Sequence, residues 1–114
     1  MNRVRSANYY LDLKTGKEPA RDWLKGLRDR MGQARIYTRI ERAESGNFGD
    51  HKAVGDGVME LRIDVGPGYR VYYALDGADI ILLLAAGDKS THDKNITTAK
   101  KYWNSHKAES KKGK

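Results

Sequence analysis

Three cations in the second half of the chain have the residue type and placement needed to bind phosphate. Arg62, Arg70 and Lys89 each lie in or just beyond a different predicted strand of the segment 55–91. Adjacent antiparallel strands bring residues that are distant in sequence to one patch. A sheet that gathers cations in this way suits a polyanion such as nucleic acid. We therefore expect the three side chains to form one anion-binding site.

The two arginines also have an interpretation that requires no function. Arg70 can form an ion pair with Asp64 or Glu60 across a hairpin, and Arg62 can do so with Asp64 or Asp76. Phosphate binding and structural ion pairing therefore remain alternatives for both residues.

Proton transfer near neutral pH needs a titratable side chain, and His92 is the nearest candidate in the sequence. His92 can equally be a residue at the start of a helix, beside Thr91 as the cap. Glu60 is a second candidate for a general base, although a lone carboxylate on a strand is usually solvated. The sequence leaves these interpretations open.

Two further residues complete the predicted RNA contacts. Lys52 supplies charge for the RNA backbone, and Tyr72 supplies a ring on which a base can stack. Alternation along the strand predicts that at least one of Tyr69, Tyr72 and Tyr73 fills the core instead. We expect Lys52 and Tyr72 to extend the site formed by the three cations.

Composition favours an acidic partner and excludes several kinds of site. The 114 residues include 22 Lys and Arg against 15 Asp and Glu, a formal net charge of +7. This balance favours nucleic acid or another acidic partner, although a merely basic protein would show it too. The absence of cysteine excludes a disulfide, a thiolate nucleophile and a Cys-ligated zinc site. We expect no metal and no cofactor, because His51 and His106 have no companion set of ligands.

The longest apolar run, residues 80–86, is far shorter than the roughly 20 residues that cross a bilayer as a helix. Such a run is typical of a buried strand. We therefore expect no membrane segment and a cytoplasmic location.

Hydrophobic periodicity predicts the first half of the domain. A strand is expected at residues 8–13, and a helix begins near Pro19, where the first helical turn tolerates proline. Gly32 separates or kinks this helix from a second one, which ends at residues 45–47. The segment 48–57 contains five Gly or Asp residues and is expected to be a loop.

The second half reads as a β-meander followed by a helix. Strands are expected at residues 59–65, 69–73 and 80–85, with the apolar third strand central. A helix around residues 99–103 follows, and the tail 108–114 is expected to be disordered. The order β-α-α-β-β-β-α predicts one α+β domain, residues 1–107, with a mainly antiparallel sheet.

Five phrases of the sequence together resemble one family. They are GNFGD at 46–50, VGDGV at 54–58, ELR at 60–62, GPGYRVY at 66–72 and GDKST at 87–91. In this order they resemble the HigB-like addiction-module killer proteins, a branch of the RelE/ParE toxin superfamily. The resemblance covers about residues 9–103. It implies a RelE-like twisted antiparallel sheet covered by N-terminal helices.

The resemblance also implies a function, the toxin of a type II toxin–antitoxin module. RelE-like members cleave mRNA, typically in the ribosomal A site, and a cognate antitoxin, often a helix-turn-helix protein in this branch, neutralises them. The reaction needs no metal, because the ribose 2′-OH attacks the adjacent phosphate. The protein must activate that hydroxyl, stabilise phosphate charge and protonate the leaving oxygen. The expected partners are therefore the antitoxin, mRNA and the ribosome.

Residue by residue, the resemblance is uneven. Arg70 matches the family arginine that contacts the scissile phosphate, and Arg62 supplies a further phosphate contact. Lys89 stands where RelE has an arginine that stabilises the transition state, and it keeps the charge without the bidentate fork. Met59 and Glu60 occupy the strand that carries lysines in RelE. The residues expected to bind phosphate thus match the family pattern more completely than the rest of the site does.

The proton-transfer pair is not identified by the resemblance. A tyrosine that RelE uses beyond Lys89 is replaced by Asn95 or a near neighbour, and this branch more often has glutamine in place of His92. Two other functions therefore stay open. ParE-like relatives share the fold, lack RelE chemistry and poison DNA gyrase, and a third possibility is a non-toxic binding protein on the same fold.

Overall fold

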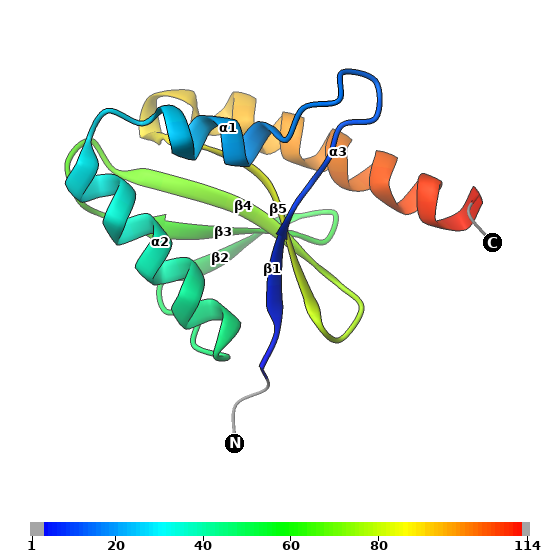
Figure 1. Ribbon diagram of the computed structural model, residues 1–114, viewed down its shortest axis with the longest axis horizontal. Helices are drawn as coiled ribbons and strands as arrows, with labels where there is room; N and C mark the ends of the chain where they lie inside the picture. Colours follow the sequence, from blue (N-terminus) through cyan, green and yellow to red (C-terminus); the bar gives the residue numbers. More distant parts are fainter. Residues whose placement is uncertain (1–3, 113–114) are drawn as a thin grey trace.

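The computed structural model describes residues 4–112 of the chain. The elements follow one another as β1 (Ser6–Tyr9), α1 (Pro19–Gly26), α2 (Arg30–Glu44), β2 (His51–Gly55), β3 (Val58–Ile63), β4 (Tyr69–Asp76), β5 (Ile80–Asp88), a 3₁₀ turn (Lys89–Thr91) and α3 (His92–Lys112) (Figure 1). Together they form a small α+β domain, as the sequence predicts.

The five strands form one mixed sheet in the order β1-β5-β4-β3-β2. Strand β1 runs parallel to β5, and the other three pairings are antiparallel. The predicted meander of β3, β4 and β5 and the mainly antiparallel character are confirmed. The apolar strand β5 is interior, as expected, although β4 is the middle strand of the five.

The prediction of a loop over residues 48–57 is wrong for residues 51–55. Residues His51–Gly55 form the edge strand β2, which pairs with β3. The hairpin turns at Asp56 and Gly57, and both have positive φ, 57° and 83°. Asp-Gly is a favoured pair for such a turn because both central residues must be left-handed. The hairpin signal was present in the sequence but was hidden among the other Gly and Asp residues.

Two boundaries differ from those predicted. The break between α1 and α2 lies at Leu27–Asp29, and Gly32 is buried inside the first turn of α2. A Cβ at Gly32 would come within 2.6 Å of both Asp29 and Tyr69, so glycine serves close packing there. Asp29 accepts a hydrogen bond from the backbone N–H of Gly32 at 3.0 Å, which caps α2.

The ends of the predicted elements also shift. Strand β1 covers Ser6–Tyr9 rather than residues 8–13. Helix α3 extends to Lys112, so residues 108–112 continue the helix, whereas we expected a disordered tail from residue 108. Residues 113 and 114 of that tail lie outside the described residues. None of the described helices is long and apolar enough to span a membrane.

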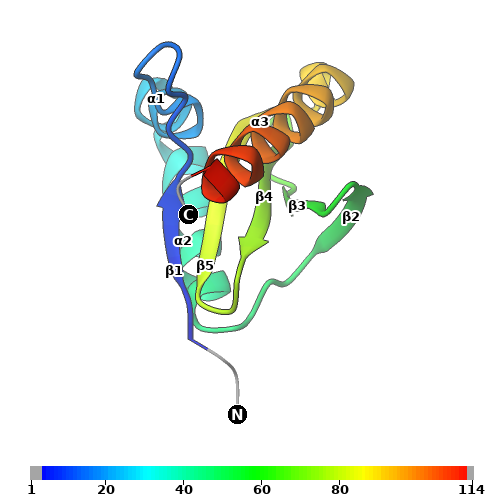
Figure 2. The same ribbon diagram turned by 90° about the vertical axis from the view of Figure 1, so that its right-hand side faces the viewer.

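Two cores lie on opposite faces of the sheet. Figure 2 shows α1 and α2 on one side and α3 on the other. On the α1–α2 side the core contains Ile36, Leu61 and Tyr73, whereas the α3 side contains Val58 and Trp103. Neighbouring residues of a strand point to opposite faces, so Leu61 and Glu60 belong to different sides. Glu60 therefore faces α3.

Candidate functional site

Two cross-strand rows bring the predicted site residues to the α3 face of the sheet. In the first row, Lys52 of β2 lies opposite Glu60 of β3, and Glu60 lies opposite Tyr72 of β4. In the next row, Arg62 lies opposite Arg70. Residues paired across antiparallel strands share a face, so four of the predicted residues gather around Glu60. The juxtaposition expected for Arg62 and Arg70 is confirmed.

Glu60 is the centre of this cluster and is almost completely buried, with 1% of its surface exposed. Its Oε2 lies 3.4 Å from Nε of Arg70 and 3.7 Å from Nε of Arg62. Its two carboxylate oxygens lie 3.2 and 3.3 Å from Nε2 of His92. The expectation of a solvated carboxylate is therefore wrong. A buried charge requires partners, and three cationic or titratable side chains surround this one.

Arg70 is itself 8% exposed and has partners on two sides. Besides Glu60, its Nη1 lies 3.3 Å from Oδ1 of Asp64 and donates to the backbone carbonyl of Tyr69 at 2.9 Å. Both ion pairs considered from the sequence therefore exist. A phosphate would meet a guanidinium that is already oriented.

Arg62 is more accessible than Arg70, with about a third of its side chain exposed. Its carbonyl accepts a hydrogen bond from Arg39 of α2, which also donates to the carbonyls of Phe48 and Asp50. Arg39 thus fixes the backbone of β3 at Arg62 from the other face. The alternative pair of Arg62 with Asp76 is wrong, because Asp76 contacts His106 at 2.7 Å.

His92 opens α3 and turns its ring toward the sheet. Asp88 caps the preceding turn by accepting from the backbone N–H of Ser90 at 2.8 Å. The Nδ1 of His92 lies 3.3 Å from Asp93, while Nε2 meets Glu60. With 37% of its side chain exposed, His92 reaches both solvent and the buried carboxylate. This is the arrangement expected of a proton-transfer group held by a second residue.

Lys89 lies at the margin of the cluster. Its backbone N–H donates to the carbonyl of Gly68 at 2.9 Å, and its stem covers Gly68. Gly68 has a φ of +84°, and a Cβ there would meet the Cε of Lys89 at 2.9 Å. Within residues 4–112, no ion pair with Lys89 is found. Its charge is exposed beside the strand end that carries Arg70.

The prediction that Tyr72 stacks on a base is not compatible with its position. Its side chain is fully buried, and its hydroxyl has no hydrogen-bond partner among the described residues. The Tyr72 and His92 rings lie 6.3 Å apart between centroids. Burial, and next the charge of Glu60, raise the pKa of Tyr72 to about 12. Tyr69 and Tyr73 are also buried, so all three tyrosines fill the cores.

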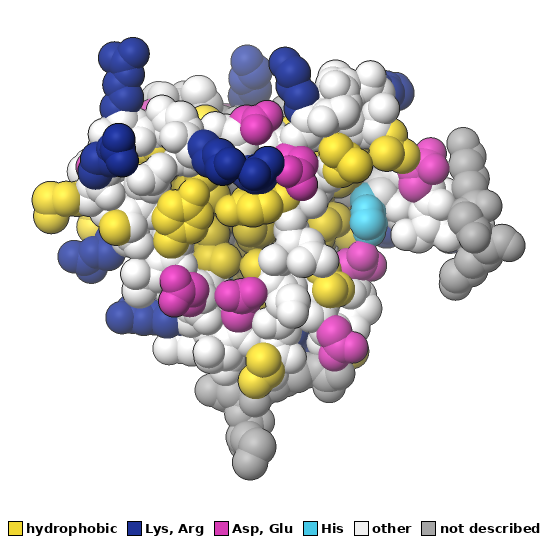
Figure 3. All heavy atoms as spheres, in the orientation of Figure 1, with side chains coloured by type: hydrophobic (Ala, Val, Ile, Leu, Met, Phe, Trp, Pro, Cys, Tyr) yellow, Lys and Arg dark blue, Asp and Glu magenta, His cyan; other side chains and the backbone are white. Residues whose placement is uncertain are grey.

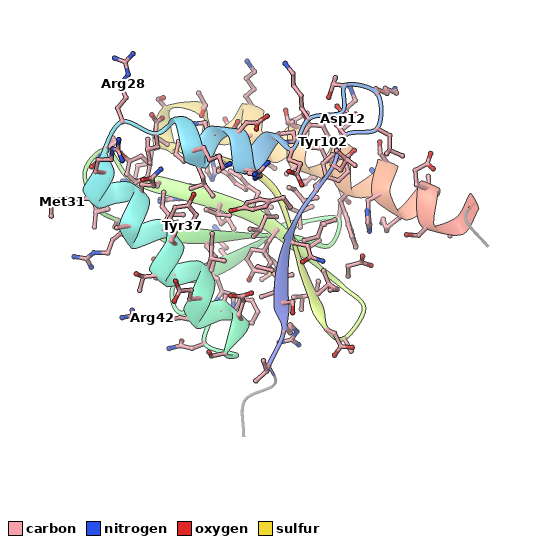
Figure 4. The ribbon with its side chains drawn as sticks, viewed as in Figure 1. Asp12, Arg28, Met31, Tyr37, Arg42 and Tyr102 are labelled. Carbon is pink, nitrogen blue, oxygen red and sulfur yellow. The ribbon has the colours of Figure 1, made fainter. Side chains whose placement is uncertain are left out.

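A cavity of about 660 Å³ lies at the other end of α3, between that helix, β1 and the loop after it. Asp12 and Tyr102 both line it, from the loop and from α3 (Figure 4). The rings of Tyr102 and Tyr10 stack there at 4.7 Å. In Figure 3 hydrophobic side chains gather around β1, with Lys and Arg mainly at the upper and left margins. The cavity is apart from the Glu60 cluster.

Within residues 4–112, no group of three or more His, Cys, Asp or Glu side chains is arranged to hold a metal ion. Two guanidinium groups and a lysine can bind phosphate, and the His92–Glu60 pair can move a proton.

Comparison with known proteins gives two matches. The family described as "Phage derived protein Gp49-like (DUF891)" matches residues 22–104, which include α2, the whole β2–β5 region and most of α3. An uncharacterized protein of Haemophilus influenzae strain Rd is 51% identical over 78 residues, which cover 68% of this chain and 79% of that protein. The chain belongs to the Gp49-like family of phage-derived proteins.

Proposed function

We propose that this protein is the toxin of a type II toxin–antitoxin module and that it cleaves mRNA. The observation that carries the proposal is the cluster on the α3 face, where Arg62 and Arg70 flank a His92–Glu60 pair. The Gp49-like family is toxin-like and of the RelE/HigB addiction-module type, which supports the first half of the proposal.

The cluster supplies most of what cleavage by a ribose 2′-OH requires. Arg62 and Arg70, with Lys89 and Lys52 at the margins, bind the phosphate and stabilise its developing charge. His92 exchanges a proton with the 2′-hydroxyl or with the leaving oxygen. We further propose that the reaction takes place at the ribosome, in the cytoplasm, and that an antitoxin, a helix-turn-helix protein, blocks it.

Induced expression followed by mapping of mRNA ends tests the proposal. New ends should appear within minutes in cells that express the wild type and should be absent in cells that express Arg62→Ala at equal protein level. Arg62 is the better choice for this test because Arg70 is buried and its loss would also weaken the fold. Growth arrest without new mRNA ends would refute the proposed nuclease activity.

A second candidate is inhibition of DNA gyrase without catalysis, and the burial of Arg70 and Tyr72 favours it. Those two residues would then hold the sheet together rather than contact RNA. A supercoiling assay with the purified protein separates the two candidates. Inhibition of supercoiling with intact mRNA would replace the first proposal by the second.

A further inference from the structure

We infer that the two carboxylates around Arg70 have different tasks. Glu60 is a fixed positioning residue for the guanidinium groups and for His92, and Asp64 is the anion that a substrate phosphate replaces. This assignment rests on the proposed phosphate-binding role of the cluster.

The contacts of Glu60 favour a permanent role. Its carboxylate lies within ion-pair distance of the Nε atoms of Arg62 and Arg70, without a hydrogen bond to either, which leaves the terminal nitrogens of Arg62 to other partners. The side chain is 2% exposed and also contacts His92. A ligand that displaced Glu60 would leave a negative charge in the interior without a partner, which is strongly unfavourable. Glu60 also pairs with both of the arginines that lie opposite each other on β3 and β4, so its charge offsets their mutual repulsion.

The contacts of Asp64 favour an exchangeable role. Asp64 follows the end of β3, and 63% of its side chain is exposed. It contacts Arg70 at the terminal Nη1, the nitrogen type that forms bidentate bonds to phosphate. Because the Asp64 carboxylate is largely solvated, it loses little when it gives up Arg70, and an incoming anion that takes its place keeps the guanidinium paired. The hydrogen bond from Nη1 to the carbonyl of Tyr69 keeps the guanidinium in place during the exchange.

The two tasks predict opposite effects of neutralising each carboxylate. By charge alone, both Glu60→Gln and Asp64→Asn would strengthen anion binding, because each removes a negative charge beside Arg70. If Glu60 positions the arginines, Glu60→Gln weakens binding instead. The sign of its effect therefore separates positioning from competition.

The experiment titrates inorganic phosphate, and then a short 2′-deoxy-substituted RNA that cannot be cleaved, into purified full-length variants. We expect Asp64→Asn to bind about three times more tightly, as loss of one exposed competitor implies. We expect Glu60→Gln to bind roughly ten times more weakly, as loss of preorganised geometry implies. Asp56→Asn is the matched control, because Asp56 is 67% exposed and pairs with Lys100 instead. Tighter binding by Glu60→Gln, or no effect of Asp64→Asn, would overturn the assignment.

A measurement on the wild type covers the case in which Glu60→Gln does not fold. Carbon NMR of the side-chain carboxylates, recorded at rising phosphate, should shift the Asp64 signal and leave that of Glu60 unchanged. A shift of Glu60 without one of Asp64 would refute the assignment. The proposed nuclease is judged separately, by cleavage of unmodified RNA, so that its failure and the failure of the carboxylate assignment are distinguishable.

Discussion

Two histidines of helix α3 each pair with a carboxylate of the sheet, and the two pairs differ in almost every other respect. His92 meets Glu60, whose side chain is 2% exposed, among two arginines. His106 meets Asp76 at 2.7 Å, where both side chains are partly exposed and the ring of His106 stacks on Trp103. The first pair lies in a polar, charged interior and the second at the rim of an aromatic cavity.

The difference shows that the pair itself does not define a site. Both pairs join α3 to the sheet, so both contribute to the packing of the helix. Only at Glu60 do cations from neighbouring strands surround the carboxylate, because β3 and β4 place Arg62 and Arg70 opposite each other. Position in the sheet, rather than residue type, gives one pair a phosphate-binding environment. Four predictions test this comparison.

The largest expected effect is on stability. Glu60→Ala should lower the free energy of unfolding by about 3 to 5 kcal/mol, because it leaves Arg70 buried without its interior partner. Asp76→Ala should cost at most about 1 kcal/mol, because its pair with His106 is partly solvated. Urea denaturation of the two variants measures both values. Equal losses of unfolding free energy would mean that the two pairs contribute equally to stability, which would contradict the comparison.

The next effect is on the proposed cleavage of RNA. His92→Gln should reduce the rate at least about 100-fold, as loss of a proton-transfer group does. His106→Gln should leave it within about two-fold of the wild type, because His106 lies at the opposite end of α3. Single-turnover cleavage of an mRNA fragment with ribosomes provides the rates. If the variant at His106 were the slower of the two, the site would have to be moved to the aromatic cavity.

A smaller effect concerns pH. The pKa of Tyr72 is raised to about 12 in the folded protein, whereas a tyrosine in the unfolded chain has a pKa near 10. The unfolded chain therefore loses this proton first, and the free energy of unfolding, unaffected below pH 10, falls as the pH rises from about 10 toward 12. Tyr72→Phe should reduce that alkaline loss. It should also stabilise the protein by about 1 kcal/mol at pH 7, because the buried hydroxyl has no partner among the described residues.

Unfolding curves recorded at several pH values between 7 and 11.5 test the Tyr72 prediction. Tyr73, whose pKa burial also raises to about 12, lies on the other face and provides the matched variant Tyr73→Phe. Loss of RNA cleavage in Tyr72→Phe alone, with a stable fold, would contradict the purely structural role of Tyr72.

The smallest effect belongs to the exposed lysines. Lys52→Gln and Lys89→Gln should each reduce the salt dependence of RNA binding by about 0.7 in the slope of log K against log salt. Lys25→Gln, on α1 across the sheet, is the control and should leave the slope unchanged. Fluorescence anisotropy at several salt concentrations gives the slopes. An effect of Lys25 equal to that of Lys52 would indicate that RNA binds the whole basic surface.

The site was predictable where it depends on local alternation. The spacing of Arg62 and Arg70 within their strands, and the turn at residues 66–68 between them, are enough to place both on one face. The burial of Glu60 and Tyr72 was not predictable in this way, because it depends on α3 covering that face, and His92 of α3 lies 32 residues after Glu60 and 20 residues after Tyr72 in the chain. A polar residue in a strand of alternating polar and apolar residues is predicted to face solvent, unless it is known that another element, here α3, covers that face.

The sequence by itself determined the α+β class, the meander of β3, β4 and β5, and the set of cations available to the α3 face. Local periodicity and turn residues carry that information, and each acts over a few residues. The tertiary structure alone decided that β1 pairs in parallel with β5 and that Glu60 rather than a cation is the centre of the cluster. Those outcomes depend on which distant surfaces meet, because a buried carboxylate is stable only where its partners from other elements converge.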